Sequence, residues 1–265
     1  MPFIIAFAVI LAVLLFLIFP SIKKHPDLNL IKGRCIAHRG LHNNEKGIPE
    51  NSLSAFKAAV EMGYAIENDI HLTKDGAVVV FHDDDLRRAC GIDKKICKIT
   101  LSELKKLRIF GTDEVIPTLE ECLNVINSQV PLLIEFKVDK NSKELCTAAD
   151  KILENYKGEY LIQSFYPQVL FWYRKHRNDV CRGQLASAFK GDALHKQIAG
   201  CLLFNFISRP HFVSYEHTFK NRFFFKISVL LGAFPVGWTF KKQREIIESH
   251  NTFKSFIFED FIPKL

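Results

Sequence analysis

Four short groups of polar residues stand out in the first half of the chain, each at the end of a short apolar run. The groups are His38-Arg39, Glu67 with Asp69, His82-Asp83, and Glu135 with Lys137. In the second and fourth groups one residue separates the pair, so on a β-strand both side chains point to the same face. A carboxylate that faces a protein interior is costly unless a metal ion or a cationic group accompanies it. These groups therefore indicate a charged site.

The three carboxylates among these groups indicate a metal site. Glu67, Asp69 and Glu135 offer oxygen ligands only, which favours a divalent cation such as Mg2+ or Ca2+ over zinc. The alternative is a network of salt bridges without a metal, in which Glu67 and Asp69 pair with Arg39 and Lys137.

The remaining polar residues indicate acid–base chemistry on an anion. Histidine is a natural general acid and base at neutral pH, so His38 and His82 are candidates for these two roles. Arg39 and Lys137 supply positive charge for an anionic oxygen, above all a phosphoryl oxygen. The residues alone therefore predict metal-assisted cleavage of a phosphate ester.

From residue 34 onward, short apolar runs alternate with stretches of helical spacing. The pattern predicts strands over residues 35–37, 65–72, 77–81, 130–136, 160–164, 180–186, 212–214, 235–239 and 255–258. It predicts helices over residues 52–62, 101–107, 117–127, 143–156 and 167–175. We expect Asn51 to cap the first helix and Pro117 to open the third. This alternation of strand and helix is typical of a parallel sheet.

Seven or eight such units predict a TIM (β/α)8 barrel over residues 34–265, in which the polar strand ends converge at one end of the barrel. A doubly wound open sheet is the alternative, but no Gly-x-Gly-x-x-Gly follows the first strand. The polar residues 83–115 follow the third predicted strand and are interpreted as a small insertion. Residues 23–33 are interpreted as a linker.

The composition excludes several classes of protein. The chain has 36 Lys and Arg against 29 Asp and Glu, a net charge of +7, and 48% hydrophobic residues, which excludes a disordered or collagen-like chain. Seven cysteines without a Cys-x-x-Cys exclude a disulfide scaffold and a zinc ribbon. The mild positive charge suits an anionic substrate or lipid surface. Nothing indicates a nucleic-acid partner, and the oligomeric state stays open.

The N-terminus contains an uninterrupted apolar run over residues 3–19. With its flanks it is about 20 residues long, which as a helix would span one bilayer core of about 30 Å. A cleaved signal peptide is the alternative, but no Lys or Arg precedes the run and no Ala-x-Ala follows it. We therefore predict a single-pass transmembrane anchor over residues 1–22. Lys23, Lys24 and Lys32 follow the run, which predicts a cytoplasmic catalytic domain.

Six motifs occur in a fixed order along the soluble part of the chain. They are IAHRG at 36–40, PENS at 49–52, IENDIHLTKDG at 66–76, FHD at 81–83, PTLEE at 117–121 and IEFK at 134–137. Together they resemble the glycerophosphodiester phosphodiesterase family, over about residues 34–262. Weaker similarities follow in QSF at 163–165, GWT at 237–239 and FIFED at 256–260.

The resemblance implies a TIM barrel with an insertion and the hydrolysis of glycerophosphodiesters to sn-glycerol 3-phosphate and an alcohol. In the family mechanism the neighbouring glycerol hydroxyl attacks phosphorus, and water then opens the cyclic phosphate. His38 and His82 match the acid–base pair, and the motifs do not tell the acid from the base. The residues that match the metal ligands are Glu67, Asp69 and Glu135. The residues that match substrate contacts are Arg39, Lys137 and Trp238.

Two positions depart from the family pattern. The usual Val-Asn after Trp-Thr is Phe240-Lys241 here, so the rim near Trp238 differs, and Asn68 stands where an apolar or aromatic residue is usual. Two other functions fit the same motifs. One is a membrane-anchored lysophospholipase D, which a wide apolar mouth around Trp238 and residues 83–115 would favour. The other is a barrel that binds glycerophosphodiesters without cleaving them.

Overall fold

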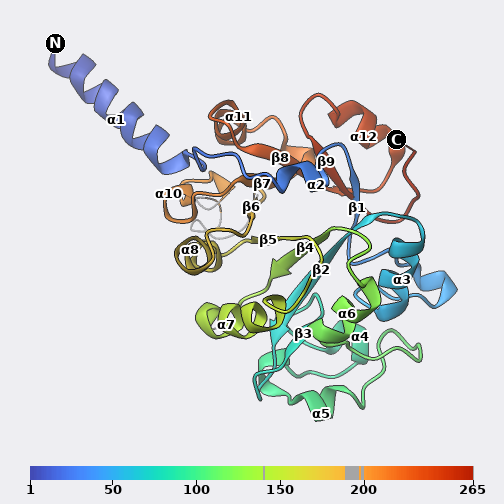
Figure 1. Cartoon of the computed structure of the whole chain (residues 1–265). Coiled ribbons are helices and arrows are strands. Elements are labelled where there is room, and N and C mark those ends of the chain that lie inside the picture. Colours follow the sequence, from blue (N-terminus) through green and yellow to red (C-terminus); the bar gives the residue numbers. More distant parts are fainter. Residues whose placement is uncertain (140, 189–196, 198–199, 265) are drawn as a thin grey trace.

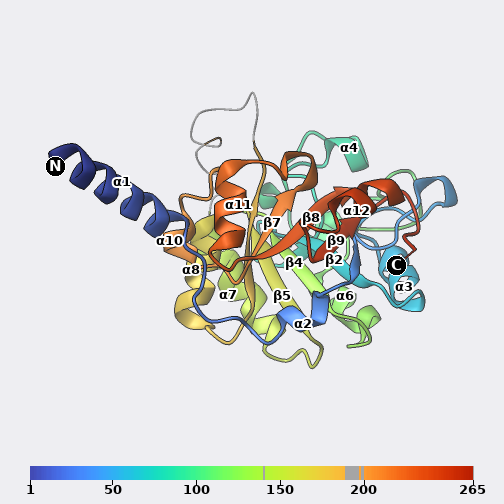
Figure 2. The same cartoon turned by 90° about the horizontal axis from the view of Figure 1, so that it is seen from above.

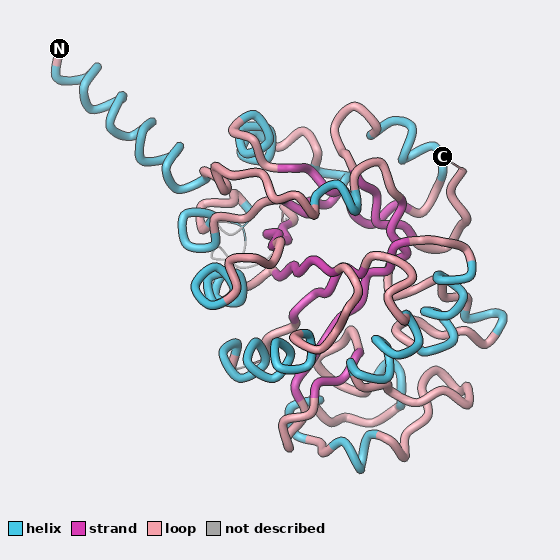
Figure 3. Tube along the Cα trace, viewed as in Figure 1, coloured by secondary structure: helices cyan, strands magenta, loops and turns pink. Residues whose placement is uncertain are grey.

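Eight parallel strands close into a barrel in the computed structural model, which describes residues 1–139, 141–188, 197 and 200–264 (Figures 1 and 3). The strands are β1 (Cys35–Ala37), β2 (Ala65–Leu72), β4 (Leu132–Phe136), β5 (Tyr160–Ser164), β6 (Arg182–Ala186), β7 (Phe212–Glu216), β8 (Phe234–Phe240) and β9 (Ser255–Phe258). Pairing of β1 with both β2 and β9 closes the ring. The predicted TIM-type barrel is thus confirmed.

Helices surround the barrel (Figure 1). They are α3 (Leu53–Glu61), α6 (Leu119–Ile126), α7 (Ser142–Leu153), α8 (Pro167–His176), α10 (Asn205–Ser208), α11 (Phe223–Leu230) and α12 (Gln243–Ser249). The short helix α2 (Leu28–Ile31) instead packs Leu28 and Ile31 into the apolar cluster inside the barrel. Two predicted helix starts are wrong by one or two residues. Ser52, whose hydroxyl accepts from Ala55 N–H at 3.1 Å, caps α3 in place of Asn51. Thr118 caps α6, so Pro117 lies outside that helix.

The predicted third strand is present as β3 (Val78–Val80). The prediction that it is one of the parallel strands of the barrel is wrong. β3 runs antiparallel to β2, with Leu72 opposite Val78. Thr73 N–H donates to the carbonyl of Ala77 across a tight turn. A connection this short joins only antiparallel strands, because a parallel crossover needs a dozen or more residues. β3 is therefore the outer arm of a hairpin that leaves the barrel.

The segment after β3 forms a small unit of its own, within and around the predicted insertion 83–115. Its elements are α4 (Arg87–Cys90), the 3-10 turn η2 (Ile96–Lys98) and α5 (Leu101–Leu104). A separate apolar cluster that includes Val79, Phe81 and Leu86 holds this unit together. The unit therefore packs around its own core rather than around the barrel core.

The N-terminal helix α1 (Pro2–Ile18) projects away from the barrel in both cartoon views (Figures 1 and 2). It has 17 residues, which at 1.5 Å per residue is about 26 Å, less than the hydrocarbon core of a bilayer. In the part of the chain that the structure describes, no helix combines the length and the apolar character needed to cross a membrane. The structure therefore does not support the transmembrane anchor predicted over residues 1–22.

Alternation along β2 decides which side chains face the barrel interior. Ile66 and Ile70 pack outward into the cluster between strands and helices, whereas Ala65 belongs to the apolar cluster that fills the interior. Glu67 and Asp69 share the inward face with Ala65, further along the strand. Charged groups thus lie above an apolar floor, at the carboxyl end of the barrel.

Candidate active site

The three predicted metal ligands meet on two neighbouring strands. Asp69 on β2 lies opposite Glu135 on β4 in the parallel register, and Glu67 lies two residues before Asp69. Ligand oxygens of all three carboxylates lie within 4.8 Å of one another, and all three side chains are buried. The fold therefore brings together the three carboxylates that the sequence analysis proposed as metal ligands.

Two cations lie against this carboxylate cluster. The Lys137 ammonium is 3.1 Å from Asp69 Oδ1 and 2.5 Å from Glu135 Oε1. Arg39 Nε is 3.5 Å from Asp69 Oδ2, and the backbone N–H of Arg39 donates to Glu67 Oε2 at 3.2 Å. Both cations therefore reduce the repulsion among the carboxylates, and both line the neighbouring cavity.

The electrostatics of the cluster follow from burial and from these pairings. Burial, together with the charges of Asp69 and Glu135, raises the pKa of Glu67 well above its ordinary value. Burial also acts to raise the pKa of Asp69, but Lys137, His82 and Arg39 outweigh it and lower that pKa. Glu67 is therefore the carboxyl group that holds a proton most readily when no cation compensates it.

The cluster passes a test of fit for a hard divalent cation. It offers three buried carboxylates and no nitrogen or sulfur ligand, the donor set that suits Mg2+ or Ca2+. Three carboxylates face two cationic side chains. The third carboxyl group therefore either carries an uncompensated negative charge or holds a proton. A bound cation would supply the missing positive charge, and Glu67, Asp69 and Glu135 are the residues that would hold it.

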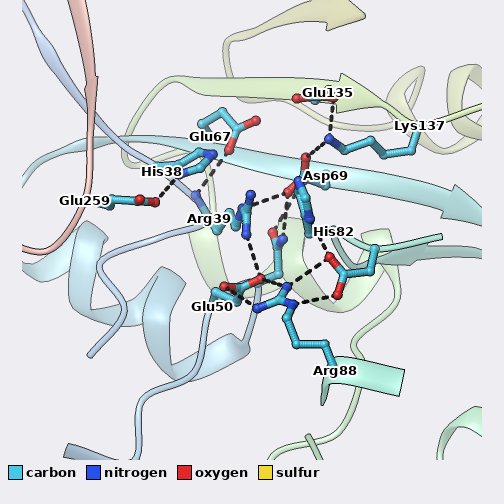
Figure 4. Close-up of polar contacts among 12 residues, drawn as sticks. His38, Arg39, Glu50, Glu67, Asp69, His82, Arg88, Glu135, Lys137 and Glu259 are labelled. Carbon is cyan, nitrogen blue, oxygen red and sulfur yellow. Dashed lines mark hydrogen bonds and ion pairs between the residues drawn. The ribbon is translucent and has the colours of Figure 1, made fainter. Parts of the chain in front are cut away.

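Two imidazoles flank the cluster, and a carboxylate orients each one (Figure 4). His38 Nδ1 lies 2.5 Å from Glu259 Oε2, just beyond the end of β9. His82 Nδ1 lies 2.7 Å from Asp83 Oδ1. In both rings the carboxylate favours a proton on Nδ1, which leaves Nε2 for the cavity. Burial lowers the pKa of His38 despite its contact with Glu259.

Residues of the PENS motif form hydrogen bonds with charged side chains of the site. Glu50 Oε1 accepts from Arg39 Nη1 at 2.8 Å and from Arg88 Nη2 at 2.6 Å. Arg88 also donates from Nε to Asp83 at 2.6 Å, so one guanidinium connects the partners of Arg39 and His82. The side-chain amide of Asn51 donates to Asp69 at 2.9 Å. Glu50 therefore holds Arg39, and Asn51, which was expected to cap a helix, instead holds Asp69.

A cavity of about 320 Å³ is lined by both imidazoles, both cations and two of the three clustered carboxylates: His38, His82, Arg39, Lys137, Glu67 and Glu135. Trp238 lines it as well, and its indole packs edge-on against Phe165 with ring centroids 5.9 Å apart. Apolar side chains among the described lining residues are Phe165, Leu185, Trp238 and Ile257. The cavity thus combines charged and polar groups with apolar surface that includes two aromatic rings, and its size suits a small ligand.

Three further residues of the site were not predicted as site residues. Gln163 donates to Glu67 at 3.4 Å and accepts from Ser214 at 2.7 Å. Lys241 Nζ is 2.8 Å from Glu259 Oε1, so the unusual Lys241 pairs with the partner of His38. The weak QSF and FIFED similarities contain Gln163 and Glu259, but nothing in them indicates which side chains they contact.

Comparisons with known proteins find similar sequences and similar structures. The sequence profile described as "Glycerophosphoryl diester phosphodiesterase family" matches residues 38–193. A glycerophosphodiester phosphodiesterase of Caldanaerobacter subterraneus is 34% identical over 147 residues, 51% of this chain and 59% of that protein. Lysophospholipase D GDPD1 of Rattus norvegicus is 30% identical over 160 residues, 56% of this chain and 49% of that protein. The chain therefore matches about half to three fifths of the length of these relatives.

Solved structures match over most of the chain. An Oleispira antarctica phosphodiesterase, solved in complex with the product sn-glycerol-3-phosphate, has a TM-score of 0.71 and 26% identity, covering 86% of this chain and 93% of its own. A glycerophosphodiester phosphodiesterase from Thermotoga maritima has a TM-score of 0.66 and 25% identity, with 84% and 93% covered.

Glu259→Gln should lower kcat on a glycerophosphodiester at least about tenfold, because the amide keeps the ring in place but removes the charge that stabilises an imidazolium. KM should change little, since Glu259 contacts His38 and Lys241 rather than Arg39 or Lys137, the expected phosphate contacts. Asp260→Asn is the matched control: Asp260 contacts Lys241 at 3.3 Å but not His38, and should retain kcat. Steady-state kinetics of both variants check this, and equal kcat values would contradict it.

Proposed function

Because the chain belongs to the glycerophosphoryl diester phosphodiesterase family, we propose that it hydrolyses glycerophosphodiesters to sn-glycerol 3-phosphate and an alcohol. One observation carries the proposal: two imidazoles, each held through Nδ1 by a carboxylate, share a cavity with a cluster of three buried carboxylates. Such a cavity can move a proton at two places and stabilise negative charge between them.

The substrate phosphate would lie between the two imidazoles, with Arg39 and Lys137 as its cationic contacts. Both cations line the cavity and are held by carboxylates, so they are oriented before substrate arrives. Trp238 would pack against the glycerol or the leaving alcohol. Pre-orientation matters because phosphoryl transfer depends mainly on positioning and charge stabilisation.

The cation is proposed to be Mg2+ or Ca2+, held by Glu67, Asp69 and Glu135. When bound, it would polarise a phosphoryl oxygen and lower the pKa of the attacking hydroxyl. Lys137, whose pKa burial lowers but Asp69 and Glu135 raise more strongly, stays charged beside it.

Proton transfer by the two histidines then accounts for both steps. One imidazole accepts the proton of the neighbouring glycerol hydroxyl as its oxygen bonds to phosphorus, and the other donates a proton to the departing alkoxide. The cyclic phosphate is opened by the reverse sequence, in which water gives a proton to the second ring and the glycerol oxygen regains one from the first. Each ring thus ends the cycle in its starting protonation state.

A small, water-soluble diester is the proposed substrate, because its size suits a cavity of about 320 Å³. The described lining combines charged side chains with four apolar ones, Phe165, Leu185, Trp238 and Ile257. A lysophospholipase D, the name carried by the Rattus norvegicus relative, would need room for an acyl chain. Turnover of glycerophosphocholine against lysophosphatidylcholine distinguishes the two substrates.

The location of the protein is a separate proposal: α1 attaches it to a membrane, with the barrel on the cytoplasmic side. Phe3, Phe7 and Phe16 on α1 are 88%, 68% and 57% exposed, an apolar surface that lipid would cover. Lys23 and Lys24, which follow this helix, support the cytoplasmic orientation.

His82→Ala should reduce hydrolysis of glycerophosphocholine by about a hundredfold or more without unfolding the protein, because it removes one of two proton-transfer groups. His176→Ala, at an exposed ring on α8, is the control and should retain full activity. Product analysis should find sn-glycerol 3-phosphate and choline, and EDTA should stop the reaction. Unchanged turnover in the His82 variant, or full activity in EDTA, would contradict the assigned chemistry.

Divalent-cation affinity should weaken as the pH falls. The raised pKa of Glu67 means that this carboxyl gains a proton as the pH is lowered, and the proton competes with the ion. Release of one proton on binding changes affinity by at most about tenfold per pH unit. Calorimetric titration with Ca2+ and Mg2+ in buffers of different ionisation enthalpy measures both quantities. A dissociation constant independent of pH, with no proton released, would rule out this linkage.

Phe7→Lys with Val13→Lys should release the protein from membranes, because two charges would enter the apolar surface of α1. Ile247→Lys, at a side chain that is 66% exposed on α12, is the control. Vesicle flotation separates bound from free protein, and protease digestion of sealed membranes reports the side on which the barrel lies. Equal flotation of all three proteins would argue against attachment through α1.

A further inference from the structure

A second hollow, of about 780 Å³, lies at the opposite end of the barrel from the candidate active site. We call it the basal groove. It contains Arg182, the first residue of β6, and His211, which precedes β7, so it opens at the amino ends of the strands. The active-site groups gather at the carboxyl ends, where a TIM barrel places its catalytic loops. The basal groove is therefore not an extension of the catalytic cavity.

Five cationic side chains line the basal groove: Lys23, Lys24, Arg174, Arg182 and Arg209. Among the described residues that line it there is no Asp or Glu. Two carboxylates lie near His25 at its edge, and both are engaged: Asp27 with His25 at 3.4 Å, and Asp179 with Arg177 at 3.0 Å. The groove thus concentrates positive charge that no described lining carboxylate neutralises.

Among these cations, Arg182 gives the strongest indication of an anionic ligand, because only 2% of the residue is exposed. Its Nε donates to Ser208 O at 3.0 Å and its Nη2 to Arg209 O at 3.1 Å, so two backbone carbonyls fix the guanidinium. Its Nη1 is buried and has no hydrogen-bond partner among the described residues. A buried charged donor without an anionic partner is costly, unless a ligand supplies the anion.

The neighbouring charges increase that cost. Burial and the nearby Arg174 lower the pKa of Arg182 to about 10, so it stays charged at neutral pH while repelling its neighbours. Burial, Arg182 and His25 lower the pKa of His211 to about 3, so this imidazole stays neutral. Arg174 and Arg209 donate to backbone carbonyls, at 2.9 Å and 2.7 Å. An anion in the groove would therefore meet oriented guanidinium groups.

The position of the groove indicates what carries the anion. Phe16 and Phe19, at the foot of α1, line the groove together with the cations, and Arg209 stacks over the Phe16 ring at 4.7 Å. From this foot α1 extends away from the barrel (Figures 1 and 2). A phospholipid presents a phosphate beside acyl chains, the same succession of charge and apolar surface. A free phosphate would use the cations and leave the apolar surface uncovered.

We propose that the basal groove binds the phosphate group of an anionic phospholipid, with Arg182 as its buried contact, Lys23 and Lys24 at its rim and α1 beside the acyl chains. This site is distinct from the catalytic one, and it requires neither hydrolysis nor the insertion of α1 into a bilayer.

The test is calorimetric titration of the full chain with dioctanoyl phosphatidic acid below its micellar concentration, and separately with inorganic phosphate. Saturable binding of the lipid is expected. The double change Lys23→Gln with Lys24→Gln should weaken it about thirtyfold, because two basic side chains near an anionic headgroup together contribute on the order of 2 kcal/mol. Arg182→Gln should abolish it. Lys143→Gln with Lys151→Gln, on exposed positions of α7, is the matched control and should bind as the unaltered protein does.

Hydrolysis of glycerophosphocholine should be unchanged in the Lys23/Lys24 variant, since the groove lies at the far end of the barrel. If Arg182→Gln does not fold, the rim variant decides the result. No lipid binding, or binding that the rim and control variants weaken equally, would overturn the site. Inorganic phosphate binding as tightly as the lipid would overturn the lipid as the ligand.

Discussion

Repulsion among Glu67, Asp69 and Glu135 is the constraint around which the upper interior of the barrel is arranged. The three groups are buried within 4.8 Å of one another, where little solvent screens their charges. Lys137 and Arg39 approach from the same layer, and Glu50 in turn holds Arg39. Breaking any one of these pairings leaves a buried charge without compensation, which is why the arrangement is rigid before a cation or a phosphate arrives.

Most of the barrel could be predicted from the sequence, because its signals are local. β1, β2, β5 and β9 begin and end where the apolar runs do. The two-residue spacing of Glu67 and Asp69 also placed both on one face of β2. Alternation along a strand needs no knowledge of the rest of the chain.

What could not be predicted depends on partners that are distant in sequence. Glu259 reaches His38 across 221 residues because β9 pairs with β1, a consequence of barrel closure that no short motif contains. The direction of β3 was mistaken because its apolar run is equally typical of a stave and of a hairpin arm. Asn51 is a further example. A helix-capping role can be predicted from neighbouring residues, whereas its hydrogen bond to Asp69 depends on tertiary structure.

The two ends of the barrel differ in how they neutralise charge. At the carboxyl end, cations and carboxylates are interleaved, as in Lys137 between Asp69 and Glu135. At the amino end, Arg182 and Arg209 are met by backbone carbonyls, which satisfy hydrogen bonds without cancelling charge. The two cavities therefore differ in charge: the catalytic one pairs cations with carboxylates, whereas the described lining of the basal groove contains cations and no carboxylate.

The hairpin formed by β2 and β3 separates two tasks that share one cavity. The three carboxylates stand on barrel staves, whose spacing is fixed by backbone hydrogen bonds. His82 instead follows β3, outside the ring, and is steadied by Asp83 and by Arg88 of the small unit with its own core. The distance between the two imidazoles therefore depends on the small unit after β3 as well as on the barrel. A longer or differently packed unit would move His82 relative to His38, and would so accommodate a leaving group of another size. The strands that carry the three carboxylates would not need to change.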